Sequence, residues 1–158
     1  MGVCFTHEPG GTPLGDQVRQ LVLLRDDLQV VPRAEALLMC TSRAQLVEQV
    51  IRPALARGEV VVCDRFADSS LAYQGAGRGL DMQALASVIS FATAGLQPDM
   101  TILLDLPVEI GLERKHAQQA GWNRFEGEAL AFHEKLRDGF LTLAASVAIP
   151  WPAPRLPA

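Results

Sequence analysis

The sequence predicts an α/β fold in which a parallel β-sheet is flanked by helices. Two apolar runs, at residues 60–63 and 101–104, each lead directly into an aspartate, which is typical of buried parallel strands. Stretches with apolar residues at helical spacing come before, between and after these runs. Because strands and helices alternate, we expect right-handed crossovers that bring the carboxyl ends of the strands to one ligand-binding edge.

The first expected elements are a short strand and a helix. Residues 3–6 favour a strand, and they lead into a turn at residues 9–11, where a proline and two glycines interrupt regular structure. Thr12 offers a capping hydroxyl and Pro13 suits the first position of a helix. We therefore expect a helix to begin directly after the turn.

A long helical stretch and a strand are expected next. Apolar residues recur at helical spacing over residues 32–57, where Pro53 predicts a kink or a division and Gly58 predicts the end. The strand at residues 60–63 follows at once. It carries Asp64 to its carboxyl end, where open α/β sheets bind ligands.

The second half of the chain repeats this alternation. Asp81 can cap a helix that runs toward Gly95, and residues 101–105 are expected to form the next strand. A further helix is expected from Pro107, and a final helical stretch over residues 124–147.

One domain over residues 1–148 is expected, followed by a tail. A chain of 158 residues, 49% of them hydrophobic, can build one core. Residues 149–158 contain four prolines, so neither a helix nor a strand is expected there.

Charge and cysteine content limit the classes of function. The formal net charge is −4, so no broad basic surface is expected for nucleic acid or for an anionic membrane. No apolar stretch approaches the roughly 20 residues that a membrane-spanning helix requires. The three cysteines lack C-x-x-C spacing, which favours reduced thiols and a cytoplasmic setting.

A carboxylate and a guanidinium stand together at the expected ligand edge. In phosphoryl transfer, the carboxylate of Asp64 would suit Mg²⁺ and the guanidinium of Arg65 would suit a phosphate. Taken alone, the pair is better explained as a salt bridge at a strand end. Residues 69–79 add hydroxyls, an amide, a phenol and glycines, a combination that can grip a flat polar ligand.

Five segments, in the same order, resemble motifs of the thymidylate kinase family. T-H-E-P-G-G-T at residues 6–12 is similar to its T-R-E-P-G-G-T loop, and residues 35–43 resemble its substrate helix. D-R-F at 64–66 resembles its D-R-[YF] motif, residues 70–79 resemble its Y-Q-G-x-G-R-G segment, and N-R-F-E at 123–126 resembles its D-R-F-E lid motif. The resemblance implies a P-loop-kinase-like sheet and the reaction of ATP with dTMP to give dTDP, a step of dTTP biosynthesis, with Mg²⁺ as the metal.

The resemblance also implies a dTMP site. Arg43 and Arg65 would hold the phosphate and the thymine between them, and Ser70 would meet the base edge. Such contacts discriminate strongly, because a wrong base leaves buried polar groups unpaired. The residues implied for dTMP binding are Glu8, Pro9, Met39, Arg43, Arg65, Ser70, Tyr73 and Gln74.

Three residues are implied in catalysis. Asp64 would act near Mg²⁺ and the transferring phosphoryl group, Arg65 at the substrate phosphate, and Arg124 in a lid that closes over the ATP phosphates. No covalent step is needed, so catalysis would rest on positioning and on neutralising negative charge.

The sequence departs from the family pattern mainly on the ATP side. No G-x-x-x-x-G-K-[ST] segment occurs in these residues, so the phosphate loop and its lysine are missing. We expect the sheet to lack its first strand, leaving residues 60–63 without a neighbour and with an exposed apolar edge. His7 stands in place of an arginine, Met39 in place of an aromatic ring, and residues 114–124 carry fewer charges than a family lid.

Two classes of function stay open at this point. In the first, these residues belong to a nucleoside monophosphate kinase and bind dTMP, but without a phosphate loop they are not expected to bind ATP or to turn over alone. In the second, they are a non-catalytic module that binds dTMP or a partner. Met39 also leaves open another deoxynucleoside monophosphate as the substrate. The resemblance further implies a homodimer, formed through residues 35–57 and 81–94.

Overall fold

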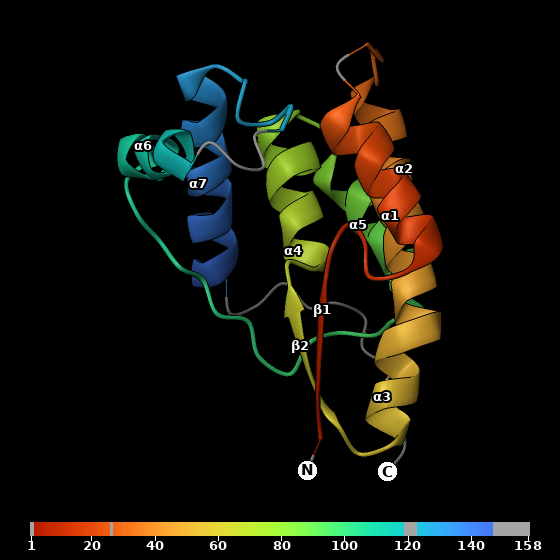
Figure 1. Cartoon of the computed structure of the whole chain (residues 1–158). Helices are drawn as coiled ribbons and strands as arrows, with labels where there is room; N and C mark the ends of the chain where they lie inside the picture. The colour runs from red at the N-terminus through yellow and green to blue at the C-terminus, as the bar shows by residue number, and fades with distance from the viewer. Residues whose placement is uncertain (1, 26, 119–122, 147–158) are drawn as a thin grey trace.

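The computed structural model of the chain describes residues 2–25, 27–118 and 123–146, and its architecture is α/β (Figure 1). Strand β1 (Val3–His7) pairs in parallel with β2 (Val60–Asp64), in a register that sets His7 opposite Asp64. Both strands were expected. The expectation that residues 60–63 lack a neighbour is wrong, because β1 pairs along the whole length of β2.

Helix α1 (Pro13–Arg19) begins where the sequence predicts and continues as the π-helical turn η1 (Gln20–Leu24). The Gly15 N–H donates to Thr12 Oγ1 over 3.0 Å, which caps the first turn. Gly11, in the preceding loop, has a φ of 73°, and a Cβ there would lie 2.5 Å from a side-chain oxygen of β1. A glycine is therefore required at this turn.

The long helical stretch is divided into three parts. They are α2 (Pro32–Leu46), the π-helical turn η2 (Val47–Ile51) and α3 (Arg52–Ala56). Pro53 has no N–H to give to the preceding turn, so the change of helical geometry just before it has a local cause. Gly58 ends the stretch with a left-handed φ of 72°, as expected.

A second group of helices follows β2. Helix α4 (Ala67–Ser70) continues directly into the π-helical η3 (Leu71–Gly77), and α5 (Met82–Thr93) comes after a short turn. Asp81 caps α5, as the sequence predicts, because its Oδ1 accepts a hydrogen bond of 2.7 Å from the Ala84 N–H.

The strand predicted at residues 101–105 does not form. The chain there is without regular structure and leads into helix α6 (Val108–Gln118). Ile102 and Leu104 are 76% and 85% exposed. An apolar run becomes a strand only beside a strand that pairs with it, and among the described residues the sheet consists of β1 and β2.

The final helix begins later than predicted. Helix α7 spans Leu130–Ala145, whereas residues 124–127 form turns. Asn123 stabilises these turns, since its Oδ1 accepts from the Phe125 N–H over 2.9 Å and its own N–H donates to Glu126 Oε2 over 2.7 Å. The expected tail at 149–158 and part of the expected lid lie outside the described residues.

Among the described residues, three apolar clusters form the core between the helices. One of them joins α1 and η1 to η3 and α7 around Phe125 and Phe132. Figure 1 shows α1 and α2 on one side of the molecule, α6 and α7 on the other, and α4 between them. One face of the sheet is uncovered, since Phe5 and Val62 are adjacent in register and 77% and 47% exposed. In the described part of the chain, no helix is long and apolar enough to cross a membrane.

Candidate functional site

The candidate site lies where one face of α2 meets the end of α4 and η3. Glu35, Met39 and Arg43 follow one another at four-residue intervals, so they lie on one face of α2. At one end, Arg43 Nη2 donates to Ser70 Oγ over 3.0 Å, and at the other, Gln74 Nε2 donates to Glu35 Oε1 over 2.8 Å. The rise of an α-helix separates these two ends by about 12 Å along α2.

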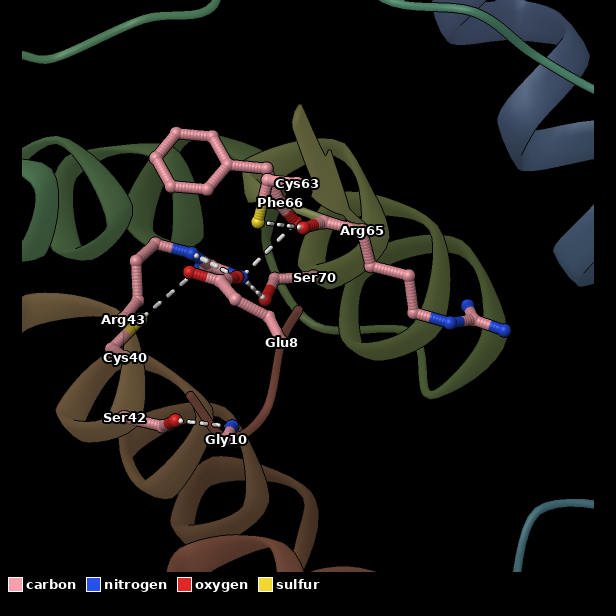
Figure 2. A network of polar contacts seen from close by, with 9 residues as sticks. All are labelled: Glu8, Gly10, Cys40, Ser42, Arg43, Cys63, Arg65, Phe66 and Ser70. Carbon is pink, nitrogen blue, oxygen red and sulfur yellow. Dashed lines mark hydrogen bonds and ion pairs between the residues drawn. The ribbon is translucent and has the colours of Figure 1, made fainter. Parts of the chain in front are cut away.

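A buried ion pair joins the loop after β1 to α2. Glu8 Oε2 lies 2.8 Å from Arg43 Nε and 2.7 Å from Nη2, and the side chains are 4% and 2% exposed (Figure 2). Nη2 also donates to the Phe66 carbonyl over 3.1 Å. The guanidinium is thus held by acceptors from the β1 loop and from the segment after β2, which fixes its direction.

The second carboxylate oxygen of this pair has no partner in the described part of the chain. Glu8 Oε1 is buried and accepts no hydrogen bond there. Burial raises the pKa of the Glu8 carboxyl, and the charge and hydrogen bond of Arg43 oppose the rise. An unpaired buried acceptor is costly, so Glu8 Oε1 is suited to a donor from a ligand or from water.

The loop that carries Glu8 and Pro9 is anchored from three sides. The Glu8 N–H donates to the Asp64 carbonyl over 3.0 Å, and the Pro9 carbonyl accepts from Arg19 Nη1 over 3.0 Å. The Gly10 N–H donates to Ser42 Oγ over 3.1 Å. Ser42 was not singled out from the sequence, where its place directly before Arg43 was the available signal.

Arg65 points away from the Glu8–Arg43 pair, as Figure 2 shows. Its Nη1 donates to the Tyr73 hydroxyl over 3.2 Å, and its guanidinium carbon lies 5.2 Å from the centre of that ring. Arg43 and Arg65, which the sequence predicts at one ligand, therefore differ in burial and in the number of their contacts. Arg43 is buried and bonded to Glu8, Phe66 and Ser70, while Arg65 is exposed and contacts Tyr73.

Arg65 also has a strained backbone. Its φ of 66° is left-handed, which is unfavourable for a residue with a Cβ, and it directly follows the ligand edge of β2. The Cys63 thiol donates to the Arg65 carbonyl over 3.0 Å, which helps to hold this conformation. Such strain is concentrated at functional sites.

An aromatic wall stands beside the polar residues. The Tyr73 ring makes edge contacts with Phe125, Phe132 and Phe140, at centroid distances of 5.0, 6.4 and 6.2 Å. Met39 packs against the same cluster. The site therefore combines polar ends with an apolar side that could receive a sugar or a base.

Arg124 is bound to Glu35. Its Nη2 lies 2.5 Å from Glu35 Oε2, and its N–H donates to the Leu23 carbonyl over 3.1 Å. The lid residue expected from the sequence thus lies against the substrate helix, and its role at ATP phosphates stays a prediction. Glu35 was not singled out as a site residue, although its four-residue spacing from Met39 was a signal.

Asp64 lies exposed at the carboxyl end of β2. Among the described residues, no group of three or more histidines, cysteines or acidic residues could hold a metal. Mg²⁺ is commonly bound through one or two carboxylates, waters and substrate phosphates, so a single exposed carboxylate fits this ion. The metal would then depend on the nucleotide for its other ligands.

Two cavities of about 180 and 200 Å³ lie outside this group of residues. The first is at the end of α5 and the second lies between residues 103–112 and α7. Neither is lined by an expected dTMP-binding residue, because the side chains of the candidate site pack on one another.

Known proteins support one family for this arrangement. The family model described as thymidylate kinase matches residues 1–149. The thymidylate kinase of Deinococcus radiodurans is 53% identical over 142 residues, which cover 90% of this chain and 68% of that protein. The thymidylate kinase of Geobacter sp. (strain M21) is 49% identical over 149 residues, which cover 91% of this chain and 66% of that protein.

A solved structure agrees with the sequence comparison. Thymidylate kinase from Ehrlichia chaffeensis superposes with a TM-score of 0.73 and 29% identity, covering 92% of this chain and 69% of that one. The chain spans about two thirds of the length of these relatives. With its five motifs, its P-loop-kinase-like fold and these matches, the chain belongs to the thymidylate kinase family.

Proposed function

We propose that these residues form the dTMP-binding side of a kinase that transfers a phosphoryl group from ATP to dTMP, giving dTDP for dTTP biosynthesis. One observation carries this proposal. Glu8, Arg43 and Ser70 come from three distant segments and meet in one buried hydrogen-bonded cluster beside the aromatic wall. Buried charges that are held this firmly in a family of nucleotide kinases favour recognition of a polar base.

Arg43 and Arg65 would bind different parts of dTMP. The buried guanidinium of Arg43 suits an uncharged base edge, because its charge is already balanced by Glu8. The exposed guanidinium of Arg65 can leave Tyr73 and meet the substrate phosphate bidentately. Tyr73 would then pack on the deoxyribose.

Catalysis would rest on positioning and charge. Asp64 would hold Mg²⁺ through water, and the ion would neutralise charge on the phosphates. Arg65 and Arg124 would stabilise the equatorial oxygens of the transferring group, Arg124 after leaving Glu35. These residues contain no G-x-x-x-x-G-K-[ST] segment, which is the loop that would bind the ATP phosphates. On their own we therefore expect them to bind dTMP without turnover, and a non-catalytic role in binding dTMP or a partner is the alternative.

A reducing, cytoplasmic setting and a homodimer are further parts of the proposal. Cys4, Cys40 and Cys63 are free thiols, which suits a reducing compartment. Leu37 of α2 and Phe91 of α5 are 56% and 89% exposed, and both lie in segments expected at a dimer interface.

The test is ligand binding by the 158-residue chain. We expect dTMP to raise the melting temperature and to bind in calorimetry, whereas ATP with Mg²⁺ does neither. Arg65→Ala should weaken dTMP binding at least tenfold, while the control Arg57→Ala, an exposed arginine next to α3, should not. The proposal fails if dTMP neither binds nor shifts melting in a chain that circular dichroism shows to be folded.

A further inference from the structure

Glu35 is a buried carboxylate that three donors share. It is 1% exposed, and its Oε1 accepts from Gln74 Nε2 over 2.8 Å. Its Oε2 lies 2.5 Å from Arg124 Nη2 and 3.4 Å from Arg78 Nη2. The three donors come from η3, the turn after η3 and the segment before α7, so Glu35 links regions far apart in sequence.

The two arginines hold the carboxylate in place. Arg78 also pairs with Glu128 over 2.6 Å, and its guanidinium carbon lies 4.8 Å from the centre of the Phe132 ring. Arg124 is fixed through its backbone bond to η1. Because its Oε2 is held by two cations, Glu35 can direct Oε1 at Gln74 in one orientation only.

This contact sets the polarity of the Gln74 amide. A carboxylate accepts hydrogen bonds and donates none, so it must face the amide nitrogen. The amide oxygen is then directed away from Glu35. Turning the amide over would set its oxygen against the carboxylate, which buries two acceptors together and is strongly unfavourable.

We propose that Glu35 is a positioning residue that makes Gln74 present only an acceptor to the base. This inference rests on the proposed dTMP site, in which Gln74 lines the pocket. A base with an N–H at the facing edge satisfies that acceptor. Thymine and uracil carry such an N–H at N3, whereas N3 of cytosine is itself an acceptor and would be left unpaired. Glu35 would therefore reject cytosine without contacting it.

The test compares affinities for three nucleotides. Dissociation constants for dTMP, dUMP and dCMP are measured by calorimetry on the 158-residue chain and on Glu35→Gln. In the unchanged chain we expect dTMP to bind at least 100-fold more tightly than dCMP. Glu35→Gln allows the Gln74 amide to turn over, so this ratio should fall at least tenfold. The ratio of dTMP to dUMP should stay within twofold, because both bases carry N3–H.

Two further variants distinguish a change in the orientation of the Gln74 amide from a loss of stability of the folded chain. Glu128→Gln breaks the Arg78–Glu128 pair without touching Gln74, so it should lower the melting temperature but leave both ratios unchanged. The exchange Glu35→Gln with Gln74→Glu again presents only an acceptor to the base, and it should restore the rejection of dCMP. This exchange keeps one carboxylate in the pair, so it tests the idea even if Glu35→Gln does not fold.

The outcomes distinguish this inference from the proposed function. If the unchanged chain binds dTMP well but Glu35→Gln leaves the ratio of dTMP to dCMP affinity unchanged, the proposed role of Glu35 is wrong. The proposed dTMP site is then not contradicted. The same holds if Glu128→Gln lowers that ratio as much as Glu35→Gln does, or if the exchange variant fails to restore it. If the unchanged chain binds no dTMP, both are overturned.

Discussion

Arg43 and Glu8 form a buried ion pair in which Nε and Nη2 of the arginine both lie within 2.8 Å of Glu8 Oε2. The two residues are 35 positions apart in sequence, and their side chains are nearly inaccessible to solvent. Burying two charges costs free energy that their attraction only partly returns, so such a pair stabilises a fold weakly while its disruption is costly. The place of this pair beside Ser70 is therefore better explained by binding than by stability.

Removing one partner of this pair should therefore lower the free energy of unfolding. Glu8→Ala leaves the Arg43 guanidinium buried and unpaired, and we expect a loss of about 3–5 kcal/mol in the free energy of unfolding, measured in urea. Replacing both residues, as Glu8→Leu with Arg43→Met, should recover most of that loss but not dTMP binding. Glu59→Ala, which breaks an exposed pair with Arg57, is the control and should change stability little. Equal effects of Glu8→Ala and Glu59→Ala would contradict this account.

Substitutions at Arg65 should separate binding from stability. The left-handed φ of 66° suits glycine, so Arg65→Gly should leave the free energy of unfolding unchanged or raise it by up to about 1 kcal/mol. Arg65→Ala keeps the strain and should be the less stable of the two. Both variants lose the guanidinium, so dTMP affinity should fall at least tenfold in each. The assignment of strain is wrong if glycine and alanine give equal stability in urea unfolding.

The sequence predicts this fold best where the signals are local. Thr12 and Asp81 each cap a helix through a hydrogen bond to an N–H three residues on, and both helix starts are found where expected. The strand at residues 101–105 fails for the opposite reason. Its apolar residues have the composition of a strand. A strand also needs a neighbouring strand for its backbone hydrogen bonds, and composition does not specify that neighbour.

The candidate site is predictable to a similar degree. The motifs identify Arg43, Ser70 and Gln74, which lie on α2, α4 and η3, and the structure joins Ser70 to Arg43 and Gln74 to Glu35 of α2. The four-residue spacing from Met39 places Glu35 on the same face of α2, but its contact with Arg124, 89 positions away, is not visible in that spacing. A buried acceptor can be recognised only when its donors are known.

Met39 offers a test of the apolar side of the site. Met39→Phe should restore stacking under the base and tighten dTMP binding by about 0.5–1.5 kcal/mol, roughly two- to twelvefold in dissociation constant by calorimetry. Met39→Leu is the control, since it keeps apolar contact without a ring and should change affinity less than twofold. A weaker affinity of Met39→Phe, with melting unchanged, would show that the base does not lie on this residue.

Cys63 should react slowly with alkylating reagents in the folded chain. Burial raises the pKa of its thiol to about 12, and the charge of Glu8 adds to the rise. The thiolate is the reactive form, so at pH 8 iodoacetamide should modify folded Cys63 roughly a thousandfold more slowly than the unfolded chain in urea. The rate should rise about tenfold per pH unit up to about pH 11. Mass spectrometry of a variant with Cys4→Ser and Cys40→Ser gives the rate for this thiol alone.

The same raised pKa has a consequence for stability. The folded chain holds the Cys63 proton more tightly than the unfolded chain does, so its contribution to stability is complete below about pH 8.5. That contribution is lost as the pH rises toward 12, because the unfolded thiol ionises first. Cys63→Ala should remove this alkaline decline, and it should also loosen Arg65, because it removes the donor to the Arg65 carbonyl. Equal alkylation rates for folded and unfolded chains at pH 8 would contradict a half-buried, protonated Cys63 thiol and its support for the Arg65 backbone.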